Sequence, residues 1–106
     1  MGRTHELKSW PRFFNPITNG DRRHELRRND RNYRVGDLLL LREFDESAGT
    51  YTGRQCKAVV TSITSQDEPC AASAEGLNPE FCILSIHVAA PAEGCERPTP
   101  ATAIAR

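Results

Sequence analysis

Several patterns that identify an enzyme or a membrane protein are missing from this sequence. No apolar run approaches the roughly 18–20 residues that a membrane-spanning helix needs, and the N-terminus has no hydrophobic signal segment. The chain also has no internal repeat, no H-E-x-x-H pair and no glycine-rich phosphate loop ending in Lys-Ser/Thr. We therefore expect a cytoplasmic protein with no membrane partner.

The cysteines and histidines form no recognisable metal or disulfide pattern. The four cysteines lie 12 to 14 residues apart, with no C-x-x-C pair. We expect Cys56 and Cys82 in the core, and Cys70 and Cys95 in a loop and a tail, all as structural or incidental thiols. His-Glu occurs twice, but neighbouring residues of a strand point to opposite faces. The sequence therefore predicts no bound metal and no cofactor.

The charge of the chain is unevenly distributed, although its formal net charge is zero. Residues 1–34 hold nine Lys or Arg against four acids, whereas residues 35–106 hold five against ten. Six of the nine cations fall between positions 20 and 34. Such asymmetry is typical of a protein with a polyanionic partner. The alternative is that strand pairing intersperses the two signs and leaves no patch.

Hydrophobic periodicity predicts a mostly-β chain with one helix near its start. Four successive leucines indicate a strand that is covered on both faces, and residues 66–79 have no periodicity and are expected to form a loop. A helix over 11–19 would begin at a proline and end at Gly20, with Pro16 distorting or interrupting it. The expected strands are Thr4–Trp10, His24–Arg28, Leu38–Phe44, Gln55–Ser65 and Phe81–Val88.

These elements predict a single small β-barrel with a helix packed at its rim. We expect five or six strands joined mostly by hairpins, which favours a small barrel. We assign residues 1–90 to this domain. Residues 91–106 are rich in alanine and proline and are expected to form a disordered tail.

Ordered blocks of residues resemble a known family. The blocks are H-E-L-K-x-W-P, F-F, G-D-R-R-H-E-L-R, N-D-R-N-Y-R-V-G-D and T-G-R. Over about residues 4–88 they resemble a small bacterial and phage family of unknown function that belongs with the ASCH domains of the PUA-like superfamily. The G-x-K-x-x-E-x-R signature of ASCH domains maps onto Gly20, Arg22, Glu25 and Arg27, with arginine in place of lysine. The resemblance implies a β-barrel whose cleft beside the helix binds RNA or a nucleotide.

Some ASCH-like proteins are amidohydrolases that remove the acetyl group from N4-acetylcytidine, using a lysine, a threonine and a glutamate. In the resemblance, Arg22 stands at the lysine position and Glu25 at the threonine position. Arginine stays protonated near neutral pH and cannot act as a general base, and a carboxylate cannot replace the hydroxyl nucleophile. The resemblance therefore supports the cleft and weighs against that activity.

The candidate phosphate contacts are Lys8, Arg22 and Arg27, because a guanidinium offers a bidentate fork to phosphate oxygens and lysine a point charge. Glu25 and Arg27 share one strand face. Glu25 could therefore accept hydrogen bonds from an exocyclic amine of a base, or it could pair with a cation and close a structural salt bridge over the barrel mouth.

Trp10 is the only tryptophan and is predicted to share a strand face with Lys8. It could stack on a base. The alternative is a core tryptophan packed on Phe13 and Phe14.

Three functions remain open at this point. The first is a module that binds single-stranded RNA or a nucleotide. The second is a hydrolase of a modified nucleoside, or a ribonuclease, with Lys8 or Glu25 in acid–base roles. The third is a phage-derived module that binds a host protein.

Overall fold

The computed structural model describes residues 2–88. The predicted tail at 91–106 and Cys95 lie outside the described residues. Residues 2–88 form seven elements in the order β1, α1, β2, β3, β4, α2, β5. Their bounds are Thr4–Ser9 (β1), Pro11–Asn19 (α1), His24–Arg28 (β2), Leu38–Asp45 (β3), Thr50–Thr64 (β4), Ser73–Gly76 (α2) and Phe81–Val88 (β5).

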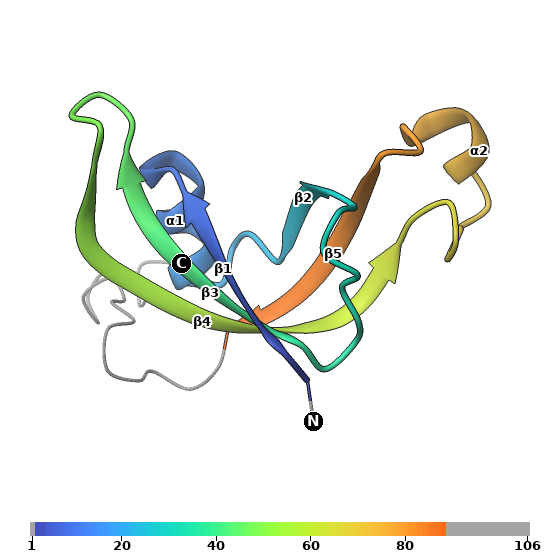
Figure 1. Ribbon diagram of the computed structural model, residues 1–106, viewed down its shortest axis with the longest axis horizontal. Coiled ribbons are helices and arrows are strands. Elements are labelled where there is room, and N and C mark those ends of the chain that lie inside the picture. Colours follow the sequence, from blue (N-terminus) through green and yellow to red (C-terminus); the bar gives the residue numbers. More distant parts are fainter. Residues whose placement is uncertain (1, 89–106) are drawn as a thin grey trace.

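The five strands form one sheet in the order β1-β3-β4-β5-β2. β1 runs parallel to β3, and the other neighbours are antiparallel. Figure 1 shows the sheet curled into a half-barrel, with the long strand β4 at its base and the edge strands on opposite arms. The predicted mostly-β, barrel-like fold is confirmed. The parallel pairing of β1 with β3 was not predicted.

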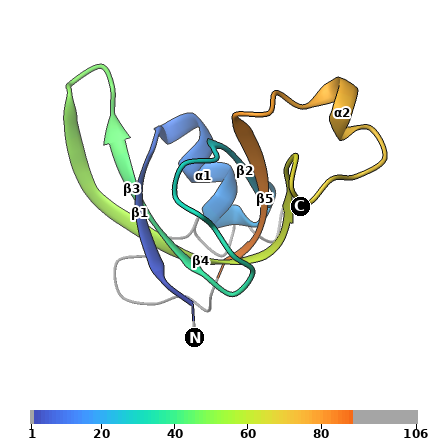
Figure 2. The same ribbon diagram turned by 45° about the vertical axis from the view of Figure 1, so that its right-hand side comes forward.

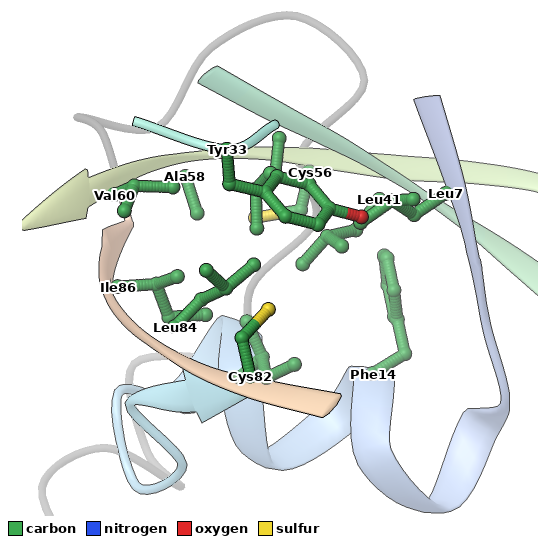
Figure 3. Packing of buried hydrophobic residues seen from close by; sticks show 12 residues of the cluster. Leu7, Phe14, Tyr33, Leu41, Cys56, Ala58, Val60, Cys82, Leu84 and Ile86 are labelled. Atoms are coloured by element: carbon green, nitrogen blue, oxygen red, sulfur yellow. The ribbon is translucent and has the colours of Figure 1, made fainter. Parts of the chain in front are cut away.

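Helix α1 lies inside the curl, between the two arms of the sheet (Figure 2). Phe14 and Ile17 are fully buried there, and Figure 3 shows Phe14 among side chains from both arms. Each fully buried side chain of this size contributes about 1.5–3 kcal/mol. The other buried core residues are Leu7, Tyr33, Leu39, Leu41, Cys56, Ala58, Val60, Cys82, Leu84 and Ile86.

Local sequence signals explain why α1 begins and ends where it does. Pro11 occupies the first turn, where its missing N–H costs nothing. Gly20 ends the helix with φ of 86°, in the left-handed region that glycine enters without strain. Its N–H donates to the carbonyl of Ile17, and the N–H groups of Asp21 and Arg22 donate to that of Pro16.

Pro16 does not interrupt the helix as one alternative predicted, because α1 is continuous from Pro11 to Asn19. Proline removes one backbone donor and crowds the preceding turn. Phe14, Ile17 and Thr18 are buried on both sides of it, and their burial offsets that cost.

Three strand and loop predictions also need correction. Only one face of the leucine strand is fully buried: Leu39 and Leu41 are enclosed, whereas Leu38 and Leu40 remain partly exposed. This alternation is expected for a sheet that packs on a single concave side. β4 begins at Thr50 rather than at Gln55. Residues 66–79, predicted as loop throughout, contain the short helix α2.

Arginine side chains span the gap between the two edge strands. Arg27 on β2 donates from Nη2 to the carbonyl oxygen of Lys8 on β1 (2.6 Å), and Arg31 donates from Nη1 to that of Glu6 (3.0 Å). An edge strand leaves backbone carbonyls without strand partners, and these charge-assisted hydrogen bonds satisfy two of them. The edges of the half-barrel are thus joined by side chains.

Candidate functional site

All five predicted site residues line one cavity of about 470 Å³: Lys8, Trp10, Arg22, Glu25 and Arg27. Ser9, Phe13 and Leu26 complete its wall. The cavity lies where the end of β1 and the start of α1 meet β2, at the gap between the sheet edges. Its volume falls within the range of about 300–1,000 Å³ that is usual for small-molecule sites.

Glu25 and Arg27 form an ion pair at this gap. Arg27 Nε donates to Glu25 Oε1 at 3.0 Å, and the carboxylate side chain is only 6% exposed. The same guanidinium bonds the Lys8 carbonyl, so Arg27 ties Glu25 to the opposite strand. The structural salt bridge proposed as one alternative is therefore present. Two hydrogen bonds within the protein hold Arg27, which leaves it less available to a ligand than a cation without such bonds.

Lys8 and Arg22 are placed differently. The Lys8 ammonium lies 4.4 Å from the centroid of the Phe44 ring, and the Arg22 guanidinium lies 4.6 Å from that of Phe13. Within residues 2–88, neither cation has a carboxylate oxygen within 4.0 Å. Because the cavity holds three cations and one carboxylate, it favours an anionic ligand.

Two buried polar atoms of the cavity residues have no hydrogen-bond partner in the described part of the chain. They are Ser9 Oγ and Arg22 Nε. A buried donor or acceptor without a partner costs on the order of 1–3 kcal/mol, and such groups are few in folded proteins.

Trp10 lies at the rim of the cavity and is 40% exposed, so the core alternative is wrong. Its ring does stack on Phe13, with centroids 6.1 Å apart and planes 24° apart. The Arg12 guanidinium lies 5.2 Å from the Trp10 ring. Leu26, on β2, is 55% exposed. The rim therefore presents two large apolar side chains to solvent.

The domain of unknown function DUF3850 matches residues 4–86. This chain belongs to that family. The match extends from the first residue of β1 into β5, so it includes every cavity residue. The chain is also similar to the "uncharacterized 12.9 kDa protein in GpA 3′ region" of Escherichia phage P2, with 39% identity over 64 residues. That alignment covers 60% of this chain and 57% of the phage protein, so the chain spans less than two thirds of its relative's length.

Sequence reasoning missed three residues of the DUF3850 cavity: Ser9, Phe13 and Leu26. The alternation of β1 puts Ser9 on one face with His5 and Leu7, but nothing local indicates that this face is buried or that it ends at a cavity. Leu26 is an apolar residue on an edge strand, and its exposure follows from the burial of its neighbour Glu25 on the other face of β2. The proximity of the F-F block to the basic signature was the one signal that could have identified Phe13.

The other arginines between positions 20 and 34 lie mostly on the surface. Arg23 donates to the Gly20 carbonyl, and Arg28 forms an exposed ion pair with Glu80 (2.6 Å). Such exposed pairs contribute little to stability, with a median of about 0–1 kcal/mol. These residues do not line the cavity.

A second buried pair, His5 and Asp37, connects β1 to the turn before β3. His5 Nε2 lies 2.8 Å from Asp37 Oδ2, and the backbone N–H groups of Arg3 and Arg34 also donate to this carboxylate. Burial alone would raise the pKa of Asp37, but these hydrogen bonds outweigh it and hold that pKa below its ordinary value. Asp37 therefore anchors β1 to the turn before β3.

Metal-binding groups and membrane-spanning helices are both absent from the described residues. Residues 2–88 contain no group of three or more His, Cys, Asp or Glu side chains that could hold a metal ion. No helix in the same range is long and apolar enough to cross a membrane.

Proposed function

We propose that this domain binds a single-stranded RNA segment or a nucleotide in the cavity between β1, α1 and β2, as an ASCH-like module of the PUA-like superfamily. One observation carries the proposal. Lys8 and Arg22 line the cavity and, within residues 2–88, have no carboxylate partner, whereas the neighbouring Arg27 is paired. Cations held on aromatic rings at a cavity wall are well suited to phosphate.

The ligand's phosphate is assigned to Lys8 and Arg22. Arg22 can offer its guanidinium fork to two phosphate oxygens, and Lys8 on β1 adds a second positive charge. Arg27 has a positioning role, because its guanidinium holds Glu25 and the backbone of β1. Binding that rests on two phosphate contacts weakens as salt rises, since each contact releases counterions.

The base is assigned to Trp10 and Glu25. The exposed indole of Trp10 can stack on any base, which contributes about 1–3 kcal/mol per base. Glu25 accepts one hydrogen bond from Arg27, but an ionised carboxylate has about four acceptor positions. The remaining positions can receive the exocyclic amine of cytosine, adenine or guanine, and uracil has no such donor.

The Gly-x-Arg-x-x-Glu-x-Arg signature is consistent with this assignment. Gly20 takes a left-handed conformation that ends α1, and the chain then turns Arg22 toward Phe13. The two signature residues on β2 face the same side and pair with each other. Each position of the signature thus has a physical role in building the cavity.

Hydrolysis is less well supported than binding. The hydroxyl among the cavity-lining residues is that of Ser9, and it has no hydrogen-bond partner among the described residues. A nucleophilic hydroxyl needs a base within hydrogen-bond reach. Incubation with N4-acetylcytidine and with labelled RNA tests this reading, and turnover that Glu25→Gln abolishes would replace binding by hydrolysis.

A titration with short single-stranded RNA tests the proposal. We expect affinity to fall between about 50 mM and 200 mM salt, and Arg22→Gln to weaken binding about 10-fold and flatten the salt dependence. Arg28→Gln is the matched control, because Arg28 lies on β2 outside the cavity. Absent binding, or equal affinities of the two variants, would overturn the proposal.

A further inference from the structure

A row of two aromatic rings with a cation at each end leads away from the cavity over the β3–β4 hairpin. We call it the hairpin strip, and it consists of Lys8, Phe44, Tyr51 and Arg42. The Lys8 ammonium lies 4.4 Å from the Phe44 centroid, and the Phe44 and Tyr51 centroids are 5.1 Å apart with planes at 78°. The Arg42 guanidinium lies 4.0 Å from the Tyr51 centroid.

Strand register places the hairpin strip on one face of the sheet. Lys8 pairs with Arg42 across β1 and β3, and Phe44 pairs with Tyr51 across β3 and β4. The register shifts between Arg42 and Phe44, but Glu43 between them is buried while both neighbours are partly exposed, so Arg42 and Phe44 lie on the same face of β3. Figure 1 shows the hairpin extending beyond the ends of β1 and α1. Lys8 belongs both to the cavity wall and to the strip, so the two surfaces are continuous.

The acids near the hairpin strip are engaged elsewhere or are weak partners. Glu43 points to the opposite, buried face, where it accepts a hydrogen bond from the Thr52 hydroxyl (2.7 Å). Asp45 Oδ1 accepts the backbone N–H groups of Ser47 and Ala48 in the hairpin turn. Glu6 lies 3.6 Å from Arg42, in a pair that is more than one-third exposed on both sides. The strip thus keeps a positive balance.

We propose that the hairpin strip extends the cavity into a track for single-stranded RNA, so that the ligand is a strand of several nucleotides rather than a free nucleotide. The proposal rests on the function proposed above, because the first nucleotide of that strand is the one in the cavity. The next bases meet Tyr51, which is 41% exposed, and the next phosphates meet Arg42. Cations for the phosphates combined with aromatic rings for the bases are the usual means of holding a single strand without reading its sequence.

Comparing two ligands of different length tests this inference. We expect a cytidine pentanucleotide to bind the wild-type chain at least about 10-fold more tightly than cytidine monophosphate. The double variant Tyr51→Ala, Arg42→Gln is expected to lose about 10-fold in affinity for the pentanucleotide and to keep its affinity for the monophosphate within about twofold. The retained monophosphate binding also shows that the variant is folded.

Two further variants sharpen the comparison. Tyr51→Phe keeps the aromatic face and is expected to bind the pentanucleotide like the wild type. Arg28→Gln removes a cation that lies 5.0 Å from the Phe81 ring on the other arm of the sheet, and it is expected to change neither affinity.

Four outcomes would overturn the track. Equal wild-type affinities for the two ligands would show that the cavity alone binds, and an unchanged pentanucleotide affinity in the double variant would remove the strip from the site. An equal loss for both ligands would mean that the substitutions act on the cavity. If neither ligand binds the wild-type chain, the proposed function fails and the track fails with it.

Discussion

Arg27, whose side chain joins the two sheet edges, should contribute far more to the free energy of unfolding than its neighbour Arg28. Arg27 bonds Glu25 and the Lys8 carbonyl, whereas Arg28 forms one exposed ion pair with Glu80. We predict that Arg27→Met destabilises the fold strongly and that Arg28→Met barely affects it. The two substitutions are chemically identical and lie side by side on β2, so the comparison isolates the contacts.

The expected loss in free energy of unfolding follows from the groups that each substitution leaves without a partner. Arg27→Met leaves the buried Glu25 carboxylate without its cation and the Lys8 carbonyl without its donor. Hydrogen bonds to charged groups contribute about 1.5–3 kcal/mol each. Because the Arg27 side chain is 25% exposed, we take the lower part of that range and expect a loss of about 2–4 kcal/mol. For Arg28→Met we expect less than about 0.5 kcal/mol.

Urea unfolding followed by circular dichroism measures both losses. With a slope of about 1.5 kcal/mol per molar urea, Arg27→Met should lower the midpoint by about 2 M. Adding Glu25→Gln should recover about 1 kcal/mol or more, because the orphaned charge is then gone. Equal midpoints for the Arg27 and Arg28 variants, or no recovery in the double variant, would refute the role assigned to Arg27.

Three further predictions concern the rest of the fold. Hydrogen bonds hold the pKa of the Asp37 carboxyl below its ordinary value, so its contribution to the free energy of unfolding is full above about pH 4 and is lost as pH falls below that value. Asp37→Asn should therefore flatten the acid part of a plot of unfolding free energy against pH. A profile that the substitution leaves unchanged would contradict this role of Asp37. Gly20→Ala should cost about 1–2 kcal/mol in urea unfolding, since φ is 86° and a Cβ meets no atom within 4 Å; no loss would argue against the left-handed cap. Alkylation followed by peptide mass spectrometry should modify Cys70 before Cys82, because a hydrogen bond from Ser73 lowers the pKa of the first thiol and burial raises that of the second; equal rates would disprove it.

Local signals in the sequence predicted most elements of the fold. Alternation along β1 puts His5, Leu7 and Ser9 on one face, which the structure shows to be the buried one, and Gly20 marked the end of α1. The parallel pairing of β1 with β3 could not be predicted, because it depends on a crossover through α1 and β2 rather than on any local pattern. The continuity of the helix through Pro16 likewise depends on burial by distant strands.

The candidate site could be predicted as a set of residues but not as a set of roles. The signature and the charge asymmetry brought Arg22, Glu25 and Arg27 to attention together. The structural role of Arg27 depends on the backbone carbonyl that its guanidinium reaches, and that carbonyl, of Lys8, lies 19 residues away in sequence. The ligand contact proposed for Arg22 depends equally on packing, because its guanidinium lies on the Phe13 ring. The exposure of Trp10 also depends on packing, because a tryptophan beside two phenylalanines fits a core equally well by sequence.

The indole N–H of Trp10 gives the most direct test of the central claim. The chain has one tryptophan, so this signal is unique in a nitrogen-15 NMR spectrum. We predict that adding cytidine monophosphate shifts the Trp10 indole signal together with the backbone amides of Ser9, Arg22 and Glu25, and that Arg22→Gln weakens the response about 10-fold. An indole signal that stays in place while amides elsewhere move, or no shift at all, would contradict a nucleotide site in this cavity.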